Sequence, residues 1–377
     1  MPGHSLKLLL LASLALPVAA RIRLPDVVDV PIEQLRTRFA ATVKAHPDDA
    51  HAHYVLGRLN AIAYTDASSQ AVRRENQEPF FGYGDHGLPP SRSAPPAAGK
   101  RDALLAAAVS EYATAVKLQP DDLTARLGWA WCLEQSRKKA QAIEQYRIVF
   151  ARAYAQEKSS KHQGLGEGPA RETGDYLVRL LDPNKDSAEI ADISVKVSAL
   201  QRRPRLMSPI LIPVEDRSAR LEQLVDSQAG VPFDLDGSGA RLNWGWITPK
   251  AGWLVYLDKR HRVESGLQMF GNRTFCISWA DGYQALSSLD RNGDGWLRGD
   301  ELKHLALWVD SNGNGLCEPG EVRPLADFHI IGLAAGSTRL HAGGFPYCPA
   351  GVEYSDGSRG PSYDWMPHTR ARARYPH

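Results

Sequence analysis

The chain has 377 residues, of which 23% are charged and 43% hydrophobic, and its formal net charge at pH 7 is only +2. That length predicts two or three domains, each with its own core. The near balance of charge argues against a general nucleic-acid binder and against a protein that coats a membrane surface.

Residues 1–20 differ in kind from the rest of the chain. Lys7 precedes an apolar run over residues 8–16, and residues 18–20 are Val-Ala-Ala, a small-residue cleavage site before Arg21. These are the parts of a secretory signal peptide, and the run is too short to span a membrane. A membrane anchor or a buried N-terminal helix is the alternative. We therefore expect a protein exported to the periplasm or beyond, with no membrane span after cleavage.

Apolar residues recur with helical spacing from Ile32 to about Arg202, so residues 21–205 are expected to form an all-α domain. Within it, two stretches repeat one another as pairs of helices. The recurring positions are Tyr54-x-Leu56-Gly57 with Ala108-x3-Tyr112-x2-Ala115-x4-Pro120, and Ala125-x3-Trp129-Ala130-x2-Leu133 with Ala142-x3-Tyr146-x2-Val149. This pattern resembles the tetratricopeptide repeat (TPR), in which a small residue lets two helices approach while an aromatic fills the groove beside it.

The resemblance implies TPR-like helical hairpins whose surface binds a protein or peptide partner. Because such stacks need three or more repeats to bury a continuous core, residues 173–181 and 187–202 are expected to supply a third pair. An insertion at about 65–100, rich in Pro, Ser and Gly, splits the first repeat. Its aromatic cluster, residues 79–87, is either a lid or ligand-binding hook or a surface loop pinned by its aromatics.

Beyond residue 205 the pattern changes to short strands, so residues 206–369 are expected to form an α+β domain, followed by a basic tail over 370–377. Strands are predicted over 209–213, 231–233, 242–246, 252–257 and 329–333, with a brief helix over 217–227. Residues 351–366 predict a hairpin with Asp-Gly in its turn. The whole chain is therefore expected to be a multidomain α+β protein.

Two acidic, glycine-punctuated loops stand out in this second half. Residues 290–301 fit the twelve-residue calcium template D-x-[DN]-x-[DN]-G-x5-E. Calcium takes six to eight oxygen ligands, and a chain curling around it turns alternate side chains inward. The expected ligands are Asp290, Asn292, Asp294, the main-chain carbonyl of Trp296 and a bidentate Glu301. Asn-Gly and Asp-Gly also mark ordinary solvated turns, which is the alternative reading.

Residues 310–321 match the same template. The expected ligands there are Asp310, Asn312, Asn314, the main-chain carbonyl of Leu316, Glu318 directly or through water, and Glu321. Between the loops, residues 302–309 have apolar side chains at helical spacing and predict one short helix that the loops share. An ordinary pair of EF-hands, with two helices for each loop, is not expected.

Several further motifs occur in a fixed order with the two loops. They are Phe233-Asp234-Leu235-Asp236-Gly237, Gly245-Trp246, Leu257-Asp258, Phe270-Gly271-Asn272-x-Thr274 and Asp281-Gly282-Tyr283-x-Ala285-Leu286. Over residues 209–333 the set resembles the calcium-binding module of secreted haemolysin-type (RTX-related) and EF-hand bacterial proteins. Asp234, Asp236 and Ser238 begin a third calcium loop, but Gly245 stands where the closing glutamate belongs, so only a weak site is expected there. Residues 258–262 are basic and would repel calcium.

Four cysteines are present, and an exported chain would permit a disulfide. Cys276 with Cys348 is the favoured pair, because Cys317 occupies the inward-facing apolar place of its loop. Cys132 is expected to be a buried small hydrophobe.

No local catalytic motif is found: the chain has no nucleophile elbow, HExxH, phosphate-binding glycine loop or CxxC pair. The expectation is a non-enzymatic, exported calcium-binding protein with two structural calcium ions. The alternative is a secreted hydrolase of envelope or extracellular polymer with calcium as scaffold. A deep pocket where two carboxylates, or a histidine and an acid, converge outside the loops would favour it.

Overall fold

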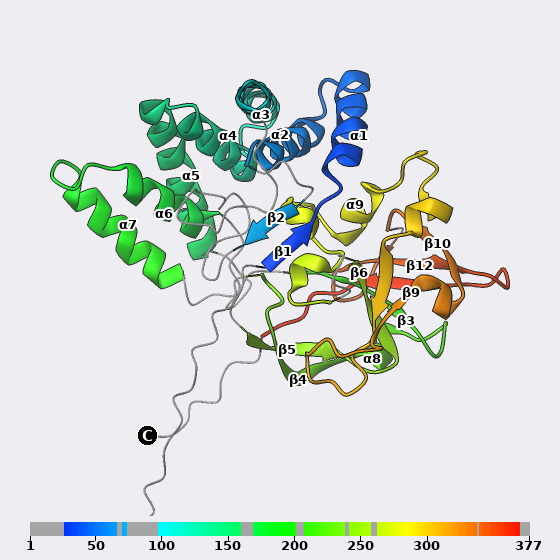
Figure 1. Cartoon of the computed structure of the whole chain (residues 1–377). Helices are drawn as coiled ribbons and strands as arrows, with labels where there is room; N and C mark the ends of the chain where they lie inside the picture. The colour runs from blue at the N-terminus through cyan, green and yellow to red at the C-terminus, as the bar shows by residue number, and fades with distance from the viewer. Residues whose placement is uncertain are drawn as a thin grey trace, which may run out of the picture.

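Helices form the N-terminal part and antiparallel strands the C-terminal part of the computed structural model, as expected for an α+β multidomain chain (Figure 1). The structure describes residues 26–65, 70–73, 97–159, 169–200, 207–237, 241–257, 262–337 and 339–369. The expected signal peptide, the aromatic cluster 79–87, Ser238, residues 258–261 and the tail 370–377 lie outside these ranges.

Seven helices follow one another in the described N-terminal part, and each packs against the next. They are α1 Ile32–Ala45, α2 Ala50–Thr65, α3 Ala98–Leu118, α4 Leu123–Gln135, α5 Lys139–Ser159, α6 Ala170–Leu180 and α7 Ser187–Leu200. The helices expected over 173–181 and 187–202 are present as α6 and α7. An unexpected strand pair, β1 Asp26–Asp29 with β2 Gln70–Arg73, ties the start of this part to the insertion.

One tyrosine explains why small residues recur in the helical part. Tyr112 of α3 is fully buried between α2 and α4. A β-carbon added to Gly57 would lie 3.1 Å from its ring, and one added to Gly128 would lie 2.3 Å from it. The glycines thus let α2 and α4 close on the aromatic ring, which is the packing that the repeat pattern predicts.

The C-terminal part is built on one long antiparallel sheet with the strand order β7-β10-β12-β13-β3-β6-β8-β9. Its strands are β3 Ile210–Pro213, β6 Ala251–Tyr256, β7 Trp296–Arg298, β8 Leu305–Trp308, β9 Val322–Pro324, β10 Ile330–Ala334, β12 Pro346–Tyr354 and β13 Arg359–Asp364, with β11 Arg339–Leu340 paired to β12. β4 Val225–Phe233 and β5 Leu242–Ile247 form a separate pair. Short helices stand between strands: α8 Leu221–Leu224, α9 Gly282–Ser287, and the 3-10 turns η1 Gly266–Gln268, η2 Thr274–Cys276, η3 Gly299–Leu302 and η4 Leu325–Phe328.

The prediction of a helix over residues 302–309 is wrong. Its residues form the end of η3 and strand β8, which pairs with β6 and β9 in the sheet. All four side chains of β8 are buried, because both faces of the sheet are covered there. A short apolar run with both faces buried loses the alternation of a half-exposed strand, so periodicity alone cannot separate it from a helix. The two loops therefore share a strand.

The helical part and the sheet part are in contact through α1, α2 and residues 272–280. Arg58 of α2 is buried and donates from Nε to the carbonyl oxygen of Cys276 over 2.9 Å. The main-chain N–H of Ser278 donates to the Tyr54 hydroxyl over 2.8 Å. The ring of Trp279 packs against aromatic rings from α1 and α2. One hydrophobic cluster consequently runs through both parts.

The turn that meets Arg58 has an uncommon backbone. Phe275 and Cys276 are buried and adopt left-handed conformations, with φ of 61° and 56°. Residues with a β-carbon seldom adopt this region, and its cost is borne only where the surroundings fix it. Here the turn presents the Cys276 carbonyl to α2.

The expected Cys276–Cys348 disulfide is not made in the structure, where all four cysteines are thiols. Cys276 belongs to the turn against α2. Cys348 lies in β12, where its main-chain N–H donates to the Tyr283 hydroxyl over 3.1 Å. Within the ranges given above, no helix has both the length and the apolar character needed to cross a bilayer.

Candidate calcium loops and helical pocket

The first loop, residues 290–301, runs from the turn after α9 into β7 and η3. Its carboxyl and amide oxygens accept hydrogen bonds from the loop's own backbone. Asp290 accepts from the N–H of Gly295 over 3.0 Å, and Glu301 accepts from the N–H groups of Arg291 and Arg298 over 2.7 and 3.1 Å. Gly295 has a φ of 80°, which supplies the sharp bend that the template needs. The oxygens are thus held toward the inside of one curl of chain.

The second loop, residues 310–321, repeats this arrangement. Asp310 accepts from the N–H of Gly315 over 2.8 Å, and Glu321 accepts from the N–H groups of Ser311 and Glu318 over 2.9 and 3.1 Å. In both loops the third-position Asn accepts from the fifth residue's N–H, and the fifth-position side chain accepts from the seventh residue's N–H. Five hydrogen bonds within the first loop therefore recur at the equivalent positions of the second.

Indole N–H groups anchor the second loop to the core, a feature that the template does not contain. Trp246 Nε1 donates to Asp310 Oδ2 over 2.7 Å, and Trp308 Nε1 donates to Glu321 Oε2 over 3.2 Å. Both carboxylates are buried, with exposed fractions of 0% and 7%. Trp246 belongs to the Gly-Trp motif of the sequence, so that motif was a signal for this contact, although its role could not be inferred without the fold.

The helical part contributes a cation beside the first loop. Burial lowers the pKa of the Arg38 guanidinium on α1, while the nearby charges of Asp290 and Glu301 raise it. This cation offsets part of the negative charge that the first loop would present to a metal ion. The second loop, by contrast, is bound by neutral indole groups.

The two loops lie at different places in the sheet. The second loop is the turn between β8 and β9, whereas the first leads into β7 at the other end of the strand order. No strand of one loop therefore pairs with a strand of the other among the described residues.

All expected ligand residues, Asp290, Asn292, Asp294, Trp296, Glu301, Asp310, Asn312, Asn314, Leu316, Glu318 and Glu321, lie within the described residues. Asn312 also donates from Nδ2 to Glu318 Oε2 over 2.6 Å. Across the described part of the chain, no three His, Cys, Asp or Glu side chains form a cluster that could hold a metal ion. The calcium template also uses amide and main-chain oxygens, so this finding does not test calcium.

At the weak third site, Asp234 and Asp236 are buried and follow β4. The main-chain carbonyl of Asp234 accepts from the N–H of Gly266 over 2.9 Å, so η1 holds this backbone in place. Ser238, the third expected ligand, lies outside the described residues.

Two hollows bear on the enzymatic alternative. One, of about 590 Å³, lies beside the second loop and is lined by Glu215, Asp327 and His329 among others. Within the described residues, the His329 ring forms no hydrogen bond to either acid. A His–acid pair does occur in the helical part: His53 Nδ1 lies 2.6 Å from Glu111 Oε2, but its Nε2 is 3.1 Å from the Pro47 carbonyl oxygen. Both nitrogens of that ring are already engaged.

The second hollow, of about 700 Å³, lies on the helical part between α3, the end of α2 and the turn from α4 to α5. We call it the helical pocket. It is open along α3, whereas parts of α1 and α2 are covered by residues 272–280.

A comparison with known families matches residues 221–365 to a family described as the SPM domain. This span begins at α8 and ends one residue after β13, and it leaves out the helical part. It also leaves out β3, which lies between β13 and β6 in the sheet. The folded sheet thus extends beyond the matched residues. No curated protein matches the chain.

Proposed function

We propose that this chain is an exported, non-enzymatic protein whose sheet part is stabilised by two calcium ions and whose helical part binds a protein or peptide. The observation that carries the calcium proposal is the recurrence of five hydrogen bonds at equivalent positions of the two loops. Ordinary turns have no reason to place the twelfth-position glutamate against the second and ninth residues twice.

The calcium would be structural. Both loops are tied to strands of the sheet, and the ends of the second loop are bonded to buried tryptophans. Calcium outside the cytoplasm is abundant enough to fill weak sites continuously, so ions there would hold the strands in place instead of switching them.

Thermal melting in calcium and in chelator tests this proposal. A site filled to 100 times its dissociation constant adds about 2.7 kcal/mol to stability, so calcium should raise the Tm. Asp290→Ala and Asp310→Ala should each remove part of the rise, and the double variant should remove all of it. Asp300→Ala is the matched control, because this carboxylate lies in the first loop at a position that the template does not use.

Calorimetric titration with calcium should give a stoichiometry of two, and of one in each single variant. A value of three would add the site at Asp234 and Asp236. No binding, or the same Tm in calcium and chelator, would contradict the proposal.

A non-enzymatic role is favoured over the secreted hydrolase by the state of the candidate acid–base groups. The ring nitrogens of His53 are both bonded inside the helical part, and His329 has no carboxylate partner among the described residues. A general base needs a free nitrogen or oxygen within hydrogen-bond reach of a substrate.

A further inference from the structure

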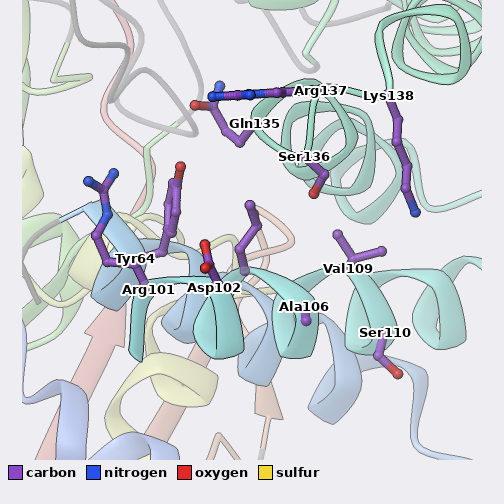
Figure 2. A pocket seen from close by; sticks show the side chains of 11 residues that line it. Tyr64, Arg101, Asp102, Ala106, Val109, Ser110, Gln135, Ser136, Arg137 and Lys138 are labelled. Atoms are coloured by element: carbon purple, nitrogen blue, oxygen red, sulfur yellow. The ribbon is translucent and has the colours of Figure 1, made fainter. Parts of the chain in front are cut away.

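Several cationic side chains line the helical pocket, which is open to solvent. Its lining is Tyr64, Arg101, Asp102, Leu105, Ala106, Val109, Ser110, Gln135, Ser136, Arg137 and Lys138. Figure 2 shows Arg101 beside Tyr64 at one end and Lys138 at the other, with Val109 of α3 pointing toward the α4–α5 turn.

Among the described residues, the three cations of the pocket have no anionic partner. In the described part of the chain Arg101, Arg137 and Lys138 form no ion pair, and the exposed Asp102 is the pocket's one acidic side chain. The Arg101 guanidinium lies over the Tyr64 ring, 4.8 Å from its centroid, and its Nε is buried without an acceptor among the described residues. Arginine has five donors and no acceptor, so the described residues leave hydrogen-bonding capacity of Arg101 unused.

Two of these cations lie where the local backbone does not favour the residue present. At Arg101 the helix dipole disfavours the positive charge, and at Arg137 the backbone conformation disfavours a β-carbon. Arg101 lies near the N-terminal end of α3, whose first turn has no acidic residue, although the helix dipole favours anions there. Arg137 adopts a φ of 60° in the turn after α4, where Lys138 N–H bonds back to the Leu133 carbonyl. This is the left-handed position that ends many helices and that glycine occupies most easily. The negative end of α4 favours a positive charge here but not a β-carbon in this conformation.

The wall between the cations is apolar. Leu105 is buried, Val109 is half-buried and Ala106 is exposed along α3. A phosphate backbone would gain nothing from this apolar wall. A peptide with acidic and apolar side chains would use both the wall and the cations.

We propose that the helical pocket binds an acidic peptide segment of a partner protein. Carboxylates of the peptide pair with Arg101, Arg137 and Lys138, and an apolar side chain lies over Leu105 and Val109. Arginine pairs with carboxylates through two parallel hydrogen bonds, which fixes the peptide's position as well as its charge. This inference rests on the proposed interaction role of the helical part and is independent of calcium.

Fluorescence anisotropy with a labelled ten-residue peptide of alternating Glu and Leu tests the inference on the full chain. We expect saturable binding that weakens with added salt, and at least tenfold weaker binding of the same peptide with Gln in place of Glu. Arg101→Ala combined with Arg137→Gly should weaken binding at least tenfold. Because glycine suits position 137, the Arg137→Gly variant should keep the wild-type Tm or exceed it.

Lys117→Ala is the matched control, since this exposed lysine lies on α3 outside the pocket. Equal binding of the Glu and Gln peptides, or an unchanged affinity in the double variant, would overturn the inference. Displacement of the peptide by polyphosphate at equal charge concentration would assign the pocket to polyanions instead. A concentration-dependent dimer that the double variant abolishes would make a second copy the occupant. These variants leave both calcium loops intact. Failure of the peptide to bind would therefore not affect the calcium proposal, and failure of calcium to raise the Tm would not affect the peptide proposal.

Discussion

A single carboxyl in the sheet part should make the stability of the protein depend on pH. Asp364 of β13 is fully buried, and burial raises its pKa well above the usual range for aspartate. The charge of Asp281 raises the pKa further, whereas the Gly282 N–H and the Ser208 hydroxyl lower it. A folded-state pKa above the unfolded one contributes stability that is complete below the unfolded pKa and is lost as pH rises through the folded pKa.

The stability of Asp364→Asn relative to the wild type should therefore increase as pH rises. We expect the difference in Tm between variant and wild type to be smallest near pH 4 and to grow toward neutral pH, because the variant has no proton to lose. Melting curves from pH 4 to 8 in chelator measure this difference. Glu353→Gln is a control that should show no trend above about pH 5, since the hydrogen bond from Arg298 lowers the pKa of Glu353 and places its titration below that range. A difference that does not vary with pH would show that Asp364 does not titrate in this range.

At the scale of the element, the helical packing depends on where glycine is used. Gly128 lies inside α4 against the Tyr112 ring, whereas Gly99 lies in the first turn of α3 with open space around it. Helix propensity favours alanine over glycine at both positions by about 1 kcal/mol. At Gly128 the added β-carbon would lie 2.3 Å from a buried ring, so the clash outweighs propensity.

Gly128→Ala should consequently destabilise the protein by roughly 1–3 kcal/mol, the range for overpacking a core. Gly99→Ala should be neutral or stabilising by up to about 1 kcal/mol. Urea unfolding of both variants at one pH provides the comparison. Equal effects of the two substitutions would mean that α2, α3 and α4 are not closed on Tyr112.

The helices and loops could be predicted because their patterns are local. The repeat of small and aromatic residues fixes α2 to α5, and the twelve-residue spacing fixes both loops. Strand β8 could not be predicted, since a buried strand and a short buried helix give the same apolar run. The indole contacts of Trp246 and Trp308 to the second loop could not be predicted either, because they depend on strands that meet only in the folded sheet.

At the scale of the molecule, the two parts should unfold together. Arg58 is fully buried at their contact and donates to the Cys276 carbonyl, and one hydrophobic cluster spans both parts. Removing a charged donor to a buried carbonyl costs about 2–3 kcal/mol. Because this hydrogen bond joins the two parts, its loss weakens their contact.

Scanning calorimetry should therefore show one transition for the wild type and two for Arg58→Met, with the overall stability lowered by about 2–3 kcal/mol. Lys44→Met is the control, because Lys44 is an exposed cation of α1. Two separate transitions in the unaltered protein would contradict a shared core.

The strand order has a consequence for solubility. The sheet ends in β7 on one side and β9 on the other, each only three residues long. Both edge strands adjoin a charged loop, and β9 ends in Pro324, which has no N–H to offer a neighbouring strand. Long, flat, uncharged edges allow one molecule to add its strands to the next, and short charged ones prevent it. The stretch from residue 290 to 324, which carries both loops, thus also guards the chain against edge-to-edge aggregation.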